Sequence, residues 1–249
     1  MRKVMVVLSG GQDSTTCLFL AKRDFEEVHA ITFDYGQRHR IEIEAACRVA
    51  SMAEIATHEI VNVSHVLNST SPLLSDAELE QYSDAQSMAK IIGKRVELTF
   101  VPMRNTLFLT VAMNRAVELG CTSLMTGICQ EDNANYPDCT EEYRAAFERM
   151  AALSLGVARF GVIAPLMYLT KAETVRLARS LPGCWEALAH SHTSYDGKYP
   201  PTDANHANVL RAAGFEEAGL PDPLVLRAVH GGVMALPLTP NYDGERHAI

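Results

Sequence analysis

The residues best suited to chemistry lie near the start of the chain, where a glycine pair follows a short apolar run. This run, Val4 to Leu8, leads into Ser9-Gly10-Gly11-Gln12-Asp13-Ser14-Thr15. Glycines let backbone N–H groups approach a ligand closely, hydroxyl groups add hydrogen-bond donors, and a following helix brings a positive partial charge at its N-terminus. We expect the Asp13-Ser14 pair to cap that helix. The loop is therefore predicted to bind phosphate groups.

This phosphate loop differs from a Walker A loop, because no lysine follows its glycines. The Walker A pattern G-x-x-x-x-G-K-[ST] uses its lysine to reach the outer phosphates of a nucleoside triphosphate. The missing lysine argues against an ordinary kinase or ATPase.

The composition is that of a globular protein with an acidic balance. Of 249 residues, 47% are hydrophobic and 21% are charged, and the formal net charge is -8. A nucleic-acid-binding surface would need a basic stripe, so nucleic acid is not an expected partner. Met1-Arg2-Lys3 leads directly into the first apolar run, and no apolar run approaches the roughly 20 residues of a membrane span. We therefore expect a cytoplasmic protein with no membrane partner.

The elements that must position the loop alternate regularly between strand and helix. Short apolar runs predict strands at 4–8, 29–35, 59–63, 96–101, 124–129 and 162–164. Apolar residues at helical spacing predict helices at about 14–22, 37–56, 105–119, 141–155 and 170–180, the last of which opens with a Thr170-to-Glu173 capping box. This alternation predicts the α/β class, with a doubly wound parallel sheet covered by helices on both faces.

Two parts of the chain depart from this alternation. Residues 64–94 are polar, weakly periodic and longer than an ordinary connection, so we interpret them as a lid or a specialised insertion. From residue 182 onward Pro, Gly, His and Asn become frequent, with helices expected near 204–213 and after Pro223. We therefore divide the chain into a nucleotide-binding α/β domain, residues 1–181, and a small helical C-terminal segment, residues 182–249.

Four loops should meet at one edge of the predicted sheet, because ligands bind beyond the C-terminal ends of parallel strands. These loops are residues 9–14, 35–40, 102–105 and 130–139. A site for a polar ligand is therefore predicted where they converge.

The first loop resembles the pyrophosphate loop of the N-type ATP pyrophosphatases, which cleave ATP between its α and β phosphates. Further motifs narrow the resemblance, and over about residues 1–220 the chain is similar to the 7-cyano-7-deazaguanine synthase family. These motifs are Phe33 to His39, Val101 to Asn105, Gly127 to Asp132, Tyr136 to Cys139 and Pro165 to Glu173. The resemblance implies an adenine nucleotide alpha hydrolase-like fold and a homodimer.

The resemblance also implies a reaction. The family is understood to activate the carboxylate of 7-carboxy-7-deazaguanine with ATP, to capture ammonia as an amide, and to convert the amide to a nitrile in a second ATP-dependent step. A carbon–nitrogen ligase of this kind must grip the departing pyrophosphate, neutralise its charge, and bind a base that presents N–H donors.

Roles for individual residues follow from matching these needs to the motifs. For ATP we assign Leu8, Ser9, Gly10, Gly11, Gln12, Asp13, Ser14, Thr15, Gly127 and Lys171. Asp13 is a candidate for holding Mg²⁺, and Lys171 or Arg38 is a candidate for neutralising pyrophosphate. Arg104 or His39 would meet the substrate carboxylate, with Asn105 beside them. Glu131, Asp132 or Asp138 would accept the N–H donors of the base, and Tyr136 would stack on its ring.

The sequence departs from the family near its C-terminal end. The zinc ion of the family is held there by four cysteines, and the aligned positions carry Ser194, Thr202, Asn205 and Asn208. Neutral hydroxyl and amide groups do not replace thiolates on Zn²⁺. We therefore expect the zinc to be absent, with a different metal site on His190, His192 and His206 as an open alternative.

The missing zinc ligands leave two alternatives to the synthase reaction open. One is a paralogue that joins the activated deazaguanine to a different amine, such as an amine of a protein substrate. The other is a non-catalytic protein that senses a nucleotide. A sulfur-transferring or tRNA-thiolating relative is disfavoured, because it would need a basic face and a redox cysteine pair, and the six cysteines include no C-x-x-C.

Overall fold

The parallel sheet predicted from the alternating pattern is present and has five strands. In the computed structural model, which describes residues 2–38, 40–130 and 135–247, the strands are β1 Lys3–Val7, β2 Glu27–Asp34, β3 Thr57–Asn62, β4 Ser123–Met125 and β5 Gly161–Ile163. Their order in the sheet is β3-β2-β1-β4-β5, with every pair parallel. The order reverses beside β1, which is where ligands bind in sheets of this kind.

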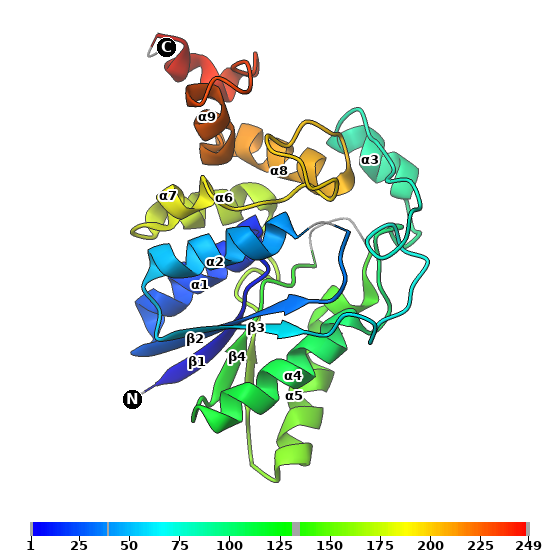
Figure 1. The fold of residues 1–249 in the computed structure, drawn as a ribbon, viewed down its shortest axis with the longest axis vertical. Helices are drawn as coiled ribbons and strands as arrows, with labels where there is room; N and C mark the ends of the chain where they lie inside the picture. Colours follow the sequence, from blue (N-terminus) through cyan, green and yellow to red (C-terminus); the bar gives the residue numbers. More distant parts are fainter. Residues whose placement is uncertain (1, 39, 131–134, 248–249) are drawn as a thin grey trace.

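Helices cover both faces of the sheet (Figure 1). One face carries α1 Gln12–Asp24, α2 Ile41–Ala53, α6 Lys171–Ser180 and α7 Cys184–Leu188. The other face carries α4 Arg104–Glu118 and α5 Glu141–Leu155. The prediction of a doubly wound α/β fold is therefore confirmed.

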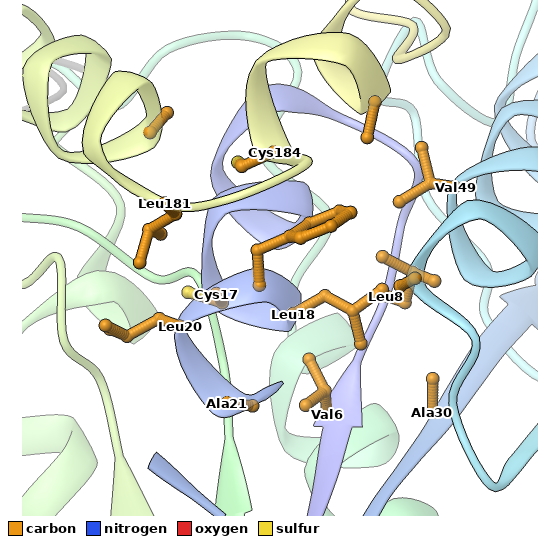
Figure 2. Packing of buried hydrophobic residues seen from close by; sticks show 14 of the residues in the cluster. Val6, Leu8, Cys17, Leu18, Leu20, Ala21, Ala30, Val49, Leu181 and Cys184 are labelled. Atoms are coloured by element: carbon orange, nitrogen blue, oxygen red, sulfur yellow. The ribbon is translucent and has the colours of Figure 1, made fainter. Parts of the chain in front are cut away.

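Strand β1 contributes to both halves of the core, because alternate side chains of a strand point to opposite faces. Val4 and Val6 are fully buried on the side of α1, whereas Met5 packs into the cluster on the side of α4. Figure 2 shows the first of these clusters, in which Leu18 of α1 lies next to Val6. Burying each such side chain contributes about 1.5–3 kcal/mol, so β1 and α1 hold the loop between them firmly.

The strand predicted at residues 96–101 is wrong. The chain folds in turns there, with Phe100 N–H donating to the Glu97 carbonyl (3.1 Å) and Arg104 N–H donating to the Val101 carbonyl (3.2 Å). The Glu97 side chain is buried, and its carboxylate accepts a hydrogen bond from Thr99 N–H (2.7 Å). Because these local bonds occupy the groups that a strand ladder would use, the segment enters α4 without joining the sheet.

Residues 64–94 pack on the C-terminal segment through α3 Ala85–Ile92 (Figure 1). A small apolar cluster joins this part to α8 His206–Ala218, and its members are Tyr82, Met88, Ile92, Val209 and Leu210. A lid role for residues 64–94 stays a prediction, and so does the division of the chain at residue 182.

The chain continues beyond α8 into α9 Pro223–His230 and the 3-10 helix η2 Pro240–His247. An earlier 3-10 helix, η1 Pro137–Cys139, precedes α5. None of the helices in the described residues is long and apolar enough to cross a membrane.

Candidate active site

A cavity of about 580 Å³ opens at the C-terminal edge of the sheet. Residues from all four of the predicted loops line it, among them Ser9, Tyr35, Arg104 and Tyr136. Three of these loops follow strands of one parallel sheet and therefore end at the same edge. The volume is within the range of about 300–1,000 Å³ that is usual for small-molecule sites.

The phosphate loop runs from β1 into α1 and is held in shape by its own hydroxyl groups. Ser9 N–H donates to Ser14 Oγ (3.2 Å), and Ser14 Oγ donates to the Gly11 carbonyl (3.1 Å). Gly10 has φ +85°, and a side chain there would collide with the backbone of α2. A Cβ at Gly127 would lie 3.1 Å from Ser14 N, so this glycine lets β4 approach the start of α1. Both glycines are therefore required by close packing around the loop.

The helix after the loop begins without a side-chain cap, so the predicted capping by Asp13 and Ser14 is wrong. The N-cap position is Gly11, and Asp13 lies inside the first turn of α1. An uncapped N-terminus leaves backbone N–H groups for an anion to accept. The buried Nε2 of Gln12 likewise has no hydrogen-bond partner among the described residues. Both features fit a phosphate group at this wall of the cavity.

Lys171 reaches the phosphate loop from a distant part of the sequence. The predicted capping box is present, because Thr170 Oγ1 accepts from Glu173 N–H (3.2 Å) and Glu173 Oε2 accepts from Thr170 N–H (2.8 Å). These bonds set the start of α6 at Lys171, whose Nζ lies 2.6 Å from Asp13 Oδ2. The capping box thus places a cation beside the loop.

A second cation faces aromatic and acidic groups in the same cavity. Arg104, the first residue of α4, has its guanidinium carbon 5.9 Å from the centre of the Tyr35 ring. Burial raises the pKa of Tyr35 to about 12, so this hydroxyl group stays protonated. Burial also raises the pKa of Glu42 to about 7, an effect that the charge of Arg104 partly opposes. A carboxyl group that titrates near neutral pH is suited to proton transfer.

Three of the predicted substrate-binding residues lie together. Asn105 and Tyr136 line the cavity, and Asn105 Nδ2 donates to the carbonyl of the buried Asp138 (3.4 Å). Burial raises the pKa of the Asp138 carboxyl group. The Tyr136 hydroxyl group donates to Glu97 Oε2 (3.2 Å), and its ring stacks on Phe100 with ring centres 5.6 Å apart. The Tyr136 ring is therefore fixed at the cavity wall.

Other residues predicted for the site are not among the described residues that line the cavity. Arg38 is not among the described residues that line the cavity, and its Nη1 donates to the Ala77 carbonyl (3.2 Å). Leu8 and Thr15 are fully buried, Leu8 in the core beneath the loop. The remaining predicted residues, His39, Glu131 and Asp132, fall outside the described part of the chain.

Glu42 and Tyr195 are among the cavity residues that the sequence did not predict for the site. Glu42 belongs to α2, whose apolar spacing indicates only the face that packs on the core. Its position in the first turn, at the edge of the sheet where ligands bind, could have indicated a role in the site. Tyr195 also lines the cavity, but it lies in the C-terminal segment, where no strand pattern links it to the sheet. The adjacent position, Ser194, showed in the sequence only that a zinc ligand of the family is missing.

Three of the four positions that align with zinc-binding cysteines meet in space, but they surround a carboxylate. Ser194 Oγ donates to Asp203 Oδ1 (2.6 Å), Asn205 Nδ2 donates to Asp203 Oδ2 (2.6 Å), and Asn208 Nδ2 donates to the Asp203 carbonyl (3.1 Å). The fourth position, Thr202, is exposed. Hydroxyl and amide groups that donate hydrogen bonds supply neither thiolate nor imidazole, so these residues do not fit Zn²⁺.

The histidines of the alternative metal site have other contacts. His190 Nδ1 lies 2.6 Å from Nη1 of Arg227, and burial together with this charge lowers the pKa of His190. His192 Nε2 contacts the Ser194 carbonyl (2.7 Å). In the described part of the chain, no group of three or more His, Cys, Asp or Glu side chains is arranged to hold a metal ion.

A parallel sheet with a glycine-rich phosphate loop after its central strand, and a cavity at its C-terminal edge, defines a nucleotide-binding α/β protein. Comparison with known proteins identifies the family. The family model described as "Queuosine biosynthesis protein QueC" matches residues 3–219, and the chain belongs to this family. The resemblance drawn from the motifs is confirmed, and so is the predicted enzyme class, an ATP-dependent carbon–nitrogen ligase.

Individual relatives are similar over most of the chain. A 7-cyano-7-deazaguanine synthase from Gloeobacter violaceus is 47% identical over 232 residues, covering 90% of this chain and 96% of the relative. One from Laribacter hongkongensis is 46% identical, covering 90% of this chain and 94% of the relative. Among solved structures, the NH3-dependent NAD synthetase from Campylobacter jejuni is 15% identical with a TM-score of 0.41, covering 92% of this chain and 75% of that one.

Proposed function

We propose that this chain converts 7-carboxy-7-deazaguanine to 7-cyano-7-deazaguanine with ATP and ammonia. The observation that supports this best is that one cavity joins the phosphate loop to Arg104, Tyr35 and Tyr136. A nucleotide at the loop and a flat carboxylated base between the cation and the aromatic rings would lie in contact there. Such proximity is what carboxylate activation needs.

In the first step the substrate carboxylate attacks the α-phosphorus of ATP, the bond to pyrophosphate breaks, and an acyl adenylate forms. Arg104 holds the attacking carboxylate by a charge-assisted contact. The N-terminus of α1 and the ammonium group of Lys171 stabilise the charge that develops on pyrophosphate. Asp13 lines the cavity in the first turn of α1, and its carboxylate oxygens are ligands of the kind that Mg²⁺ prefers, so Asp13 would hold this ion, which would supply positive charge toward the phosphates.

In the second step ammonia attacks the activated carbonyl carbon, a carbon–nitrogen bond forms, and AMP leaves. The nitrogen loses a proton, and Glu42 is suited to accept it because it lines the cavity and titrates near neutral pH. In the last step the amide oxygen takes an adenylyl group from a second ATP and releases pyrophosphate. Loss of AMP and of both N–H protons then leaves the nitrile.

The resemblance to the family also leads us to propose that the enzyme acts as a homodimer in the cytoplasm. Light scattering of the purified protein in solution measures its mass directly. A mass of one chain at micromolar concentration would contradict the homodimer.

Incubation with ATP, 7-carboxy-7-deazaguanine and ammonium chloride tests the reaction when product masses and AMP are followed together. We expect the acid to be consumed, the amide to appear transiently, and the nitrile to accumulate, with AMP release that depends on the acid. An amide end product, or a conjugate with another amine, would contradict the proposal in favour of a paralogue. ATP binding without AMP release would contradict it in favour of a sensing protein.

A further inference from the structure

The segment that carries Tyr195 starts on the phosphate loop. His192 N–H donates to the Gly10 carbonyl (2.8 Å), and His192 Nε2 lies 2.7 Å from the Ser194 carbonyl. Because a carbonyl only accepts hydrogen bonds, Nε2 carries the proton and donates it. These two hydrogen bonds set the path of residues 192–194 relative to the loop, immediately before Tyr195.

Five polar side chains meet at the next residues, and we call them the polar cluster: Ser194, Asp196, Asp203, Asn205 and Asn208. Ser194 Oγ lies 2.6 Å from Asp196 Oδ1 and 2.6 Å from Asp203 Oδ1. Asn208 Nδ2 donates to Ser194 Oγ (3.0 Å) and to the Asp203 carboxylate. Ser194 and Asn205 are each only 1% exposed, so water competes little with these bonds.

The polar cluster is tied to two further parts of the molecule. Asn205 caps α8, because its Oδ1 accepts from Asn208 N–H (3.1 Å). Directly after Asp203, Ala204 N–H donates to Gln81 Oε1 (2.7 Å), and the Ala204 carbonyl accepts from Tyr82 N–H (2.8 Å). The backbone next to Asp203 is thus held between α8 and residues 64–94.

Tyr195 lies between two members of the cluster and lines the cavity. Burial raises the pKa of Tyr195, so its hydroxyl group stays protonated. Arg104 and Glu42 line the same cavity. The hydrogen bonds of Ser194 and Asp196 hold the backbone on both sides of this tyrosine.

We propose that Asp203 is a positioning residue that holds Tyr195 against the substrate through Ser194, and that hydrogen bonds of the polar cluster do this in place of a metal ion. Asp203 accepts from three side chains of the cluster, so its removal takes an acceptor from each of them and leaves Asn205 Nδ2 with only a 3.5 Å contact to Ser194 Oγ. The part of the inference that concerns substrate rests on the proposed function.

Asp203→Ala tests the positioning role, and Asp76→Ala, at an exposed position in residues 64–94, is the matched control. We expect Asp203→Ala to raise the KM for 7-carboxy-7-deazaguanine by about ten- to a hundredfold, because a misplacement of about 1 Å costs catalysis on this order. The KM for ATP should stay within about twofold of that of the wild type. A KM for ATP that rises as much as that for the acid would overturn the role.

A double-mutant cycle links the effect to the tyrosine. If Asp203 acts through Tyr195, adding Asp203→Ala to Tyr195→Ala should not raise the KM for the acid further. Independent, multiplicative effects would overturn the proposal. Should Asp203→Ala fail to fold, the milder Asn208→Ala should raise the same KM by about fivefold, the value of one hydrogen bond, and an unchanged KM would overturn it.

Two further measurements do not depend on the reaction. Hydrogen exchange of residues 193–197 should be faster in Asp203→Ala than in the wild type, and unchanged exchange would overturn the positioning role. Wild-type protein produced in zinc-supplemented medium should hold substoichiometric metal, and EDTA should leave its melting temperature unchanged. Stoichiometric metal, or a fall in melting temperature with EDTA, would overturn the metal-free arrangement. If the exchange and metal results hold but no deazaguanine product forms, the proposed function fails and the arrangement stands.

Discussion

Lys171 Nζ lies 2.6 Å from Asp13 Oδ2, although 158 positions separate the two residues in the sequence. Asp13 is in the first turn of α1, and Lys171 is the first residue of α6. A cation at the start of a helix opposes the helix macrodipole, so its position there costs stability that the ion pair offsets. Lys171 thereby places beside the phosphate loop the ammonium group that no lysine within the loop supplies.

Replacing Lys171 with Met should slow the release of pyrophosphate by about 10²–10³-fold, because the loss of one group that stabilises developing charge costs on that order. Initial rates with labelled ATP measure the effect. Lys94→Met, at an exposed position, is the matched control and should keep the wild-type rate. A Lys171→Met rate equal to that of the control would remove Lys171 from the mechanism.

Gly214 of α8 provides the space in which Lys171 packs. A Cβ at Gly214 would lie 2.6 Å from Lys171 Cβ and 3.2 Å from its carbonyl carbon. We expect Gly214→Ala to push α6 and α8 apart, to lower the free energy of unfolding by about 1–3 kcal/mol, and to slow AMP formation. Gly244→Ala is the control, because a Cβ there meets nothing within 4 Å. Denaturant titration and initial rates measure both effects, and an unchanged rate would contradict the link between α8 and Lys171.

The fold could be predicted because its signals are local. The apolar run of β1, the glycines after it, and the Thr170-to-Glu173 capping box each lie within a few residues, and each is present in the structure. The exception is residues 96–101, where alternating apolar residues imitate a strand. In a strand, Glu97 would lie on the exposed polar face. In the structure it is buried, and its carboxylate accepts hydrogen bonds from Thr99 and Tyr136, so the segment forms turns instead.

The sequence predicted which loops form the site, but not which side chains contact one another there. Parallel topology brings the loops 35–40 and 130–139 to the phosphate loop, because they follow β2 and β4 of the same sheet. No local pattern shows that Ser194 meets Asp203 and Asn208, because 9 and 14 positions separate it from them and their contact depends on how the chain before α8 packs. For the same reason the sequence indicated which zinc ligands were missing but not which groups replace them.

Arg104→Ala should raise the KM for 7-carboxy-7-deazaguanine and leave the KM for ATP nearly unchanged, because Arg104 is proposed to bind the carboxylate of the base and not ATP. A hydrogen bond to a charged group contributes about 1.5–3 kcal/mol, which corresponds to a rise of about ten- to a hundredfold. Arg149→Ala, at an exposed position of α5, is the control. Equal rises in both KM values would show that Arg104 shapes the whole cavity rather than the carboxylate site.

Glu42 should make stability depend on pH. Burial raises its pKa from 4.5 to about 7, so the folded protein holds this proton more tightly than the unfolded chain does. The resulting stability is fully present below about pH 4.5 and is lost as the pH rises through about 7. Glu42→Gln lacks this titration. The difference between its free energy of unfolding and that of the wild type should therefore shift in favour of the variant as the pH rises from about 4.5 to about 7, and should stay constant above that. Urea titrations at several pH values measure the trend, which the exposed neighbour Glu44→Gln should not show.

The same titration should appear in the rate of amide formation. If Glu42 accepts the proton of the attacking nitrogen, it must be ionised, so the wild-type rate should rise with pH through about 7. Among the titratable groups that line the cavity with Glu42, Arg104 lowers its pKa, and Glu42 in turn raises the pKa values of Tyr35 and Tyr195. Rates should be compared at a constant concentration of free ammonia, because the ammonium ion titrates as well. Glu42→Gln should be slower by about 10²–10⁴-fold and lose the rise, since a positioned base contributes on this order. A rise that survives in Glu42→Gln would assign the proton transfer to another group.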